Sequence, residues 1–162
     1  SILVKQAVDL FDGKYGKGIT FELDLFNKPL EIMADQVQVN QIIANILINS
    51  VQAIEQNKGT VKISTGEKNF GEGELLAPLN KSKLGKGRFA FVSIKDSGCG
   101  MSEETKNRMF DPFFSTKTQG LVRGLGLASI PGIVHNHKGS ITVESELGKG
   151  TDISIFFPIS II

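Results

Sequence analysis

The sequence places one carboxylate just before two glycines, at the end of an apolar run. Residues 96–100 read Asp-Ser-Gly-Cys-Gly and follow the apolar run 89–94. Because glycine has no side chain, such a turn can bring backbone close to a flat ligand while the Asp96 carboxylate accepts a hydrogen bond from an amino group. Aspartate and glycine are also ordinary turn residues, so a turn without a ligand is the alternative. The surrounding segments favour the interpretation in which this turn binds a ligand.

Upstream of the turn, a helix predicted over about residues 36–56 presents only amide side chains along one narrow face. This amide stripe consists of Gln38, Gln41, Asn45, Asn49, Gln52 and Gln56. A solvated face normally mixes Lys and Glu, and a chance bias on an exposed face is the alternative. Amides avoid the repulsion between a carboxylate and a phosphate, and their oxygens can bind a hard cation such as Mg²⁺. The stripe therefore favours a phosphate ligand with a metal ion.

Three further segments follow in the second half of the chain. Residues 110–117 read Phe-Asp-Pro-Phe-Phe-Ser-Thr-Lys, residues 124–127 read Gly-Leu-Gly-Leu, and residues 148–151 read Gly-Lys-Gly-Thr. Several of the 18 glycines cluster between residues 98 and 150, which indicates that loops hold the functional groups. Taken in this order with the Asp96 turn and the amide stripe, these segments predict an ATP site.

The composition excludes several other classes of protein. A chain of 162 residues has the size of one ordinary domain. Its 18 basic and 17 acidic residues nearly cancel, so nucleic acid is not an expected partner. The apolar stretches are far shorter than the roughly 20 residues that span a bilayer, and residues 1–6 do not resemble a secretion signal. Cys99 is the single cysteine, which excludes an internal disulfide and favours the cytoplasm.

Hydrophobic periodicity predicts helices and strands that position these groups. Asp35 is expected to cap the long helix, and further helices are predicted over 4–11, after Ser102 and from about Gly126. Residues 66–87 are expected to form a long connection and residues 110–124 a loop. Strands are predicted over 19–25, 60–65, 88–95, 140–144 and 152–157, with 30–33 as a possible partner of the first.

Five of the segments resemble the sequence boxes of one family, the sensor histidine kinases. Residues 38–53 resemble the N box, 96–100 the G1 box and 110–117 the F box. Residues 124–127 are similar to the G2 box, and residues 148–158 to the closing strand motif. The resemblance covers the chain from about Ala34 to Pro158.

The resemblance implies an α/β fold, namely a two-layer sandwich of the Bergerat type. A mixed sheet would form one layer and helices the other, with ATP between the helices and a flexible lid. Residues 1–162 would be a single catalytic ATP-binding domain and a fragment of a longer chain. The domain would be cytoplasmic and would not touch a membrane, whether or not the parent protein is membrane-anchored.

By matching position, the resemblance also implies the residues that hold adenine. Asp96 would accept a hydrogen bond from the adenine amino group. Gly98, Gly100 and Met101 would form the base pocket, and Thr151 would close this side of the site.

On the phosphate side, the resemblance implies two catalytic residues, Asn49 and Lys117. Asn49 would ligate Mg²⁺, and Lys117 would approach the phosphates, although a solvated lysine is the alternative. Asn45 would line the phosphate region. The backbone N–H groups of Gly124, Leu125 and Gly126, at a helix start, would bind the phosphates. Phe113 and Phe114 would anchor the lid.

The chain departs from the family pattern around the lid. Val122 stands where related kinases often have glycine, and Gly120 lies upstream of that position. Pro131 falls inside the helix expected after Gly126, where it should kink or delay that helix. Arg123 could reach a γ-phosphate or remain exposed. His135 and His137 are expected at the surface or at a helix end.

The leading hypothesis is a protein histidine kinase. The domain would bind Mg²⁺ and ATP, and would donate the γ-phosphate to a histidine on a separate dimerisation domain, with a response regulator as an indirect partner. The second hypothesis is an ATP-hydrolysing relative, but such proteins place a glutamate where Asn45 stands, and an amide cannot act as a base. The third is a nucleotide-sensing module without catalysis.

Overall fold

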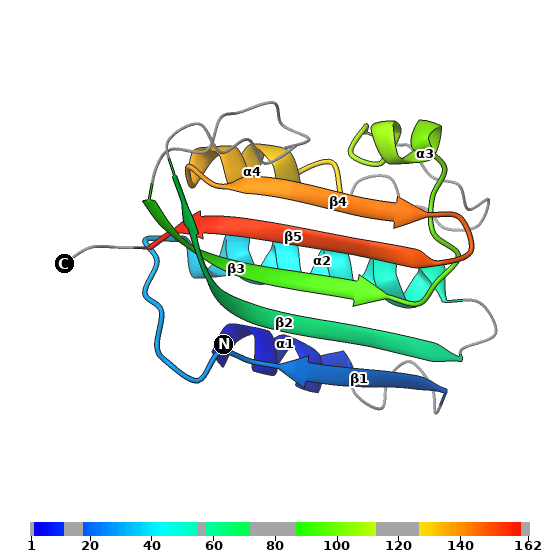
Figure 1. The fold of residues 1–162 in the computed structure, drawn as a ribbon, viewed down its shortest axis with the longest axis horizontal. Coiled ribbons are helices and arrows are strands. Elements are labelled where there is room, and N and C mark those ends of the chain that lie inside the picture. Colours follow the sequence, from blue (N-terminus) through cyan, green and yellow to red (C-terminus); the bar gives the residue numbers. More distant parts are fainter. Residues whose placement is uncertain (1, 12–17, 55–57, 72–86, 113–126, 160–162) are drawn as a thin grey trace.

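The computed structural model describes residues 2–11, 18–54, 58–71, 87–112 and 127–159 (Figure 1). Within these ranges the helices are α1 (Ile2–Phe11), α2 (Gln36–Ala53), α3 (Glu103–Arg108) and α4 (Ile130–Asn136). The strands are β1 (Ile19–Asp24), β2 (Gly59–Phe70), β3 (Gly87–Asp96), β4 (Ser140–Glu146) and β5 (Gly150–Pro158).

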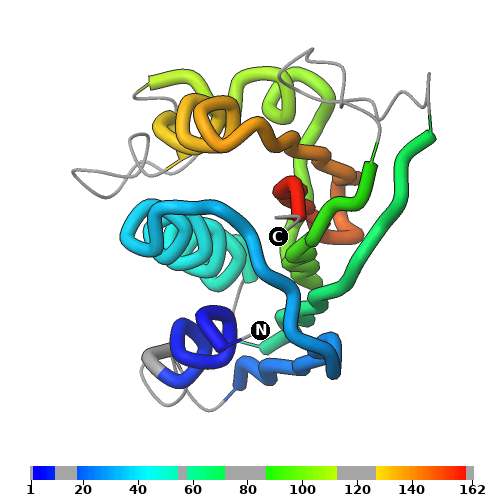
Figure 2. Tube along the Cα trace, turned by 90° about the vertical axis from the view of Figure 1, so that its left-hand side faces the viewer, coloured from blue at the N-terminus to red at the C-terminus, as the bar shows by residue number. Residues whose placement is uncertain are grey.

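The five strands form one mixed sheet in the order β1-β2-β3-β5-β4. β1 pairs with β2 in parallel, and the other neighbouring strands are antiparallel. Helices α1, α2 and α4 lie on one face of this sheet, so the fold has two layers (Figure 2). The predicted α/β sandwich with a mixed sheet is therefore confirmed.

The core lies between α2 and the sheet. The apolar side of α2 is buried, with Ile42, Ile43 and Leu47 at most 2% exposed. Alternate residues of the strands face this side, among them Ile94 and Ile155, which are at most 1% exposed. As predicted, Asp35 caps α2, since its carboxylate accepts from the backbone N–H groups of the first turn. This packing fixes the orientation of α2 and hence of its amide stripe.

The predicted pairing of residues 30–33 with the first strand is wrong. β1 pairs with β2, and within residues 30–33 the only ladder contact is an isolated antiparallel bridge between Ile32 and Ile159. The chain leaves the sheet edge after β1, where the N–H of Phe26 donates to the hydroxyl of Thr65 at 2.9 Å. Pro29 has no N–H for a ladder, and Ile32 packs against the core. Residues 25–35 therefore cross from the sheet to the helix layer.

The predicted long connection starts later than expected. Residues 66–70 continue β2, paired with β3 from Gly66 opposite Phe91 to Phe70 opposite Gly87. Gly66 lies beneath the Phe91 ring, where an added Cβ would come within 2.7 Å of ring atoms. The strand therefore depends on its partner rather than on its own apolar pattern.

Helix α4 begins later than predicted, at Ile130, and it holds Pro131 in its first turn. The first turn of a helix does not need the N–H that proline lacks, so proline is tolerated there. The expected delay of this helix is confirmed. Helix α2 ends at Ala53, three residues before the predicted end.

His137 connects the end of α4 to the start of α2. Its Nε2 accepts from the backbone N–H of Asp35 at 3.0 Å, and its Nδ1 lies 2.7 Å from the carbonyl oxygen of Ile133. Because Nε2 accepts, Nδ1 carries the proton and donates it to Ile133. The ring also packs edge-on against Phe157, with centroids 5.9 Å apart. His137 is the C-cap residue of α4, as expected from the sequence.

Candidate functional site

Asp96 is a buried carboxylate at the end of β3. Its side chain and backbone together are 3% exposed, yet it has no cationic partner among the groups that shift its pKa. Instead, the N–H of Gly98 donates to Oδ1 at 2.8 Å, and the backbone of Thr151 and the hydroxyl of Ser50 also donate to this carboxylate. Thr151 lies opposite Asp96 in the β3–β5 ladder. Neutral donors therefore hold the carboxylate in one orientation.

The buried position changes the acidity of this group. Burial raises the pKa of the Asp96 carboxyl above its ordinary value. The hydrogen bonds from Gly98, Thr151 and Ser50 oppose that change, and the charge of Asp152 adds to it, so the net shift is upward. A further donor from a ligand would stabilise the ionised form, so the site is suited to an amino group.

The two glycines of the turn let it fit between α2 and the β4–β5 hairpin. Gly98 is buried, and an added Cβ would lie 2.6 Å from the carbonyl oxygen of Ala53, the last residue of α2. The next residue, Cys99, donates its N–H to the same oxygen at 3.0 Å. Gly100 has a φ of 69°, and an added Cβ would collide with the carbonyl oxygen of Glu146. The turn is therefore fixed on both sides by backbone.

Ser145 of β4 connects the rest of this site. Its hydroxyl accepts from the N–H of Met101 at 2.8 Å and lies 2.8 Å from the hydroxyl of Thr151. It also donates to the carbonyl oxygen of Gly150 at 3.1 Å. Asp96, Gly98, Gly100, Met101 and Thr151, which the sequence predicts on the adenine side, are thus brought together in the structure.

Sequence reasoning missed two residues of this network, Ser50 and Ser145. Ser50 falls on the apolar side of α2, where it is 1% exposed. A hydroxyl among aliphatic side chains on this side was the one sequence feature that could have indicated a buried hydrogen bond. Ser145 shares a face of β4 with Ile141 and Val143, which is a similar signal. In both cases the partner is distant in sequence, so spacing alone does not identify the contact.

The amide stripe runs along α2 beside this turn. Asn45 and Asn49 are half-buried, Gln41 is exposed, and Gln56 lies outside the described residues. Asn49 precedes Ser50, which contacts Asp96, and lies one helical turn before Ala53, which receives the N–H of Cys99. The predicted metal ligand is therefore close in the fold to the predicted adenine group.

The donor set of the described residues suits Mg²⁺ only together with a ligand. Among these residues there is no group of three or more His, Cys, Asp or Glu that could hold a metal ion. Mg²⁺ usually takes one or two protein oxygens and completes its shell with phosphate oxygens and water. The amide oxygen of Asn49 fits that role.

The remaining predicted groups lie outside the described residues. These are Phe113, Phe114, Lys117, Gly120, Val122, Arg123, Gly124, Leu125 and Gly126. On either side of that segment, Met109 and Leu127 are buried in the core at 4% and 9% exposure. The two ends of the predicted lid are thus fixed to the domain.

A two-layer sandwich with a buried carboxylate beside a glycine turn and an amide-bearing helix defines a nucleotide-binding domain. Comparison with known proteins specifies the class. Residues 34–161 match the family of histidine kinase-, DNA gyrase B- and HSP90-like ATPases. The chain belongs to this family, and within it this is a catalytic ATP-binding domain of the sensor histidine kinase type.

The relatives that support this assignment are sensor kinases. The chain is 34% identical over 142 residues to the signal transduction histidine-protein kinase AtoS of Escherichia coli K12. The matched region is 88% of this chain and 20% of AtoS. It is 32% identical over 131 residues to the sensor histidine kinase ZraS of the same strain, covering 81% of this chain and 24% of ZraS. The chain thus spans about a fifth to a quarter of the length of these relatives.

The solved structures agree. The catalytic domain of histidine kinase ThkA superposes with a TM-score of 0.73 at 29% identity, covering 96% of this chain and 90% of that domain. The helices of the described residues are too short or too polar to cross a membrane.

Proposed function

We propose that this domain binds ATP with Mg²⁺ and donates the γ-phosphate to a histidine on a separate dimerisation domain of its parent protein. The observation that supports this most is Asp96, a buried carboxylate oriented by three neutral donors and without a cationic partner among the groups that shift its pKa. Such a group favours a ligand that donates a hydrogen bond, as the adenine amino group does. Its position beside the amide stripe directs the phosphates of the same ligand toward Asn45 and Asn49.

In this proposal each end of the nucleotide has its own residues. Asp96 accepts from the adenine amino group, while Gly98, Gly100, Met101 and Thr151 surround the base. On the other end the amide oxygen of Asn49 holds the cation, which neutralises phosphate charge when it is bound. The phosphates also lie near Asn45 and Lys117, and the backbone N–H groups of residues 124–126 complete their binding.

The proposed chemistry is transfer to a protein rather than to water. A hydrolase needs a base that activates water, and the stripe offers only uncharged amides at residues 45 and 49. Phosphoryl transfer depends mainly on positioning and charge neutralisation, which the site can supply. We therefore assign the general base to the acceptor domain. Hydrolysis of ATP remains the second candidate, supported by the wider ATPase family.

The proposed biological setting follows from the relatives. Residues 1–162 form one domain of a longer cytoplasmic or membrane-anchored sensor, and the histidine phosphate passes on to a response regulator. The domain itself works in the cytoplasm, without contact to membrane or nucleic acid.

Calorimetric titration with a non-hydrolysable ATP analogue, with and without Mg²⁺, tests the binding step. We expect Mg²⁺ to strengthen binding. Transfer is tested by incubating the domain and labelled ATP with a dimerisation domain from a related kinase. Label on the acceptor histidine supports a kinase, and label incorporated into the isolated domain contradicts the assignment of the acceptor elsewhere. Binding without transfer would favour a nucleotide-sensing module, and release of phosphate to water would favour a hydrolase.

A further inference from the structure

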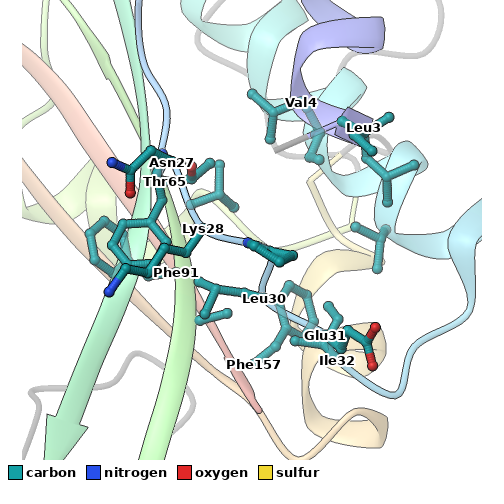
Figure 3. A pocket seen from close by; sticks show the side chains of 17 residues that line it. Leu3, Val4, Asn27, Lys28, Leu30, Glu31, Ile32, Thr65, Phe91 and Phe157 are labelled. Carbon is teal, nitrogen blue, oxygen red and sulfur yellow. Dashed lines mark hydrogen bonds between the residues drawn. The ribbon is translucent and has the colours of Figure 1, made fainter. Parts of the chain in front are cut away.

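An apolar cavity lies toward the start of β3, whereas Asp96 is at its end. Figure 3 shows the side chains that line this cavity. Its volume is about 580 Å³, within the roughly 300–1,000 Å³ of small-molecule pockets. One wall consists of Leu3 and Val4 of α1 with Val39 and Ile43 of α2, and Ala90 and Val92 of β3 line the sheet side. Protein interiors are normally close-packed, so a gap of this size between helices and sheet has room for a guest molecule.

Most of the side chains that line the cavity are apolar, among them Leu30, Ile32 and Phe157. Apolar lining of this kind is typical of a site that takes an apolar ligand. The guest therefore has an apolar body.

Charged residues are unevenly distributed around the mouth. Lys28 lies on the strand side of the cavity and Glu31 on the opposite side, beside Ile32 (Figure 3). Arg88 of β3, two residues from Ala90 and on the same face of that strand, forms an ion pair with Glu67 of β2.

On this strand side Arg88 is paired with Glu67, and Lys28 acts on Glu67 only through its charge. The hydrogen bond from Arg88 lowers the pKa of Glu67, and the charge of Arg88 and then that of Lys28 act in the same direction. Lys28 is therefore near the neutral Glu67–Arg88 pair, and it is the cation that lines the strand side of the mouth, away from Glu31. A guest with one anionic group would balance that charge beside the apolar cavity.

We propose that this cavity binds a single-chain anionic amphiphile, a fatty acid free in solution. The apolar chain lies between α1 and the sheet, against Val39 and Ala90, and its carboxylate lies beside Lys28. Both halves of the ligand are needed: burial of the chain supplies the affinity, and the exposed cation alone would hold a small anion only weakly. The site is separate from that of the nucleotide and does not depend on it.

Displacement of a fluorescent fatty acid tests the proposal. The chain has no tryptophan, so the emission of a dansyl-labelled undecanoic acid reports directly on the environment of the probe. We expect saturable binding at one site and competition by dodecanoate. Ala90→Phe fills the cavity and should weaken dodecanoate at least about tenfold. Lys28→Gln should weaken dodecanoate about three- to tenfold, without weakening dodecanol.

Lys62→Gln is the matched control, because Lys62 is also exposed but does not line the cavity. The absence of saturable binding, an unchanged affinity of Ala90→Phe, or equal losses of dodecanoate and dodecanol in Lys28→Gln would overturn the proposal. Binding to phosphatidylcholine vesicles without fatty acid would assign the surface to a membrane instead and would also overturn it.

A second measurement does not depend on the folding of the cavity variant. Methyl NMR spectra of the unaltered domain with dodecanoate should show shifts concentrated at Val39, Ile43 and Val92. Shifts centred on the residues around Asp96 would place the fatty acid in the nucleotide site and contradict the proposal.

Discussion

The same strand, β3, runs from an apolar cavity at one end to a network of hydrogen bonds at the other. At its start, Ala90 and Val92 face a space of about 580 Å³ that the chain does not fill. At its end, Asp96 is 3% exposed and its carboxylate accepts hydrogen bonds from three residues. Hydrogen bonds have direction and fix one geometry, whereas apolar contacts tolerate guests of different shape. The comparison indicates that the Asp96 end is built for one ligand and the cavity end for a class of ligands.

The backbone at the Asp96 end should tolerate no added atoms. Gly100→Ala would place a methyl group against the carbonyl oxygen of Glu146 at a φ of 69°, and we expect a loss of about 3 kcal/mol or more in the free energy of unfolding. The control is Gly148→Ala, where φ is 80° but no atom lies within 4 Å of the added group. It should cost only about 1 kcal/mol. Urea denaturation measures both, and equal losses would mean that the turn is not fixed by Glu146.

Asp96→Asn should separate ligand binding from stability. The amide places donors where the ligand also donates, so we expect ATP affinity to fall about 10- to 100-fold. Because burial raises the pKa of the carboxyl, its removal should leave the unfolding free energy at neutral pH unchanged or higher. Calorimetry and thermal unfolding measure the two effects, with Glu144→Gln as the control on an exposed carboxylate of the same sheet. An Asn variant that binds ATP as tightly as the parent would remove Asp96 from the adenine role.

The raised pKa of Asp96 also predicts a pH dependence. The ionised carboxylate accepts from adenine, so affinity should be full above the raised pKa and should fall, by up to about tenfold per pH unit, as the pH drops below it. Folding has the opposite sign: the native state binds this proton more readily, so the contribution of Asp96 to stability decreases as pH rises from the unfolded pKa through the folded one. Comparison with Asp96→Asn at each pH cancels the titration of the phosphates, and identical profiles would contradict the assignment.

Substitution of Ser50 should lower ATP affinity less than substitution of Asp96. Ser50→Ala removes one of the donors to Asp96, so the pKa of that carboxyl should rise further and ATP affinity at neutral pH should fall about three- to tenfold. Ser50→Thr keeps the hydroxyl and should recover most of the affinity. If Thr behaves like Ala, packing rather than the hydrogen bond explains the loss.

At the cavity end of β3, a larger side chain should stabilise the domain, whereas added atoms at Gly100 should destabilise it. Ala90→Leu fills apolar space and should raise the free energy of unfolding by about 0.5–1 kcal/mol. Thermal unfolding measures this gain, and ATP affinity should not change. A loss of stability would show that the space beside Ala90 is already filled in solution.

The sequence predicts well the elements whose signals are local. The apolar run in residues 89–94 predicts β3, and the pattern of residues 152–157 predicts β5. Asp35 marks the start of α2, and Pro131 predicts the delayed start of α4. Signals that depend on a distant partner are weaker. Residues 66–70 have no strand pattern of their own, and they extend because β3 lies beside them.

The residues of the candidate site also divide into those with a local sequence signal and those whose contacts depend on a distant partner. Asp96 and its glycines were recognisable, because the turn is continuous in sequence. Ser145 was not, because it meets Met101 across 44 residues, and Ser50 reads as part of the helix core. The cavity is formed by segments as far apart as residues 4 and 157, so no pattern along the chain indicates it. The roles of the predicted site residues remain predictions for the experiments above.

The imidazole of His137 has a mechanical consequence. It binds the N–H of Asp35, at the beginning of α2, from the C-cap of α4, and its tautomer is fixed by Ile133. The two helices are thus fastened together at the end remote from Asp96. The first turn of α4 is itself held in the core by Ile130, so we expect the His137 contact to transmit a movement of either helix to the other.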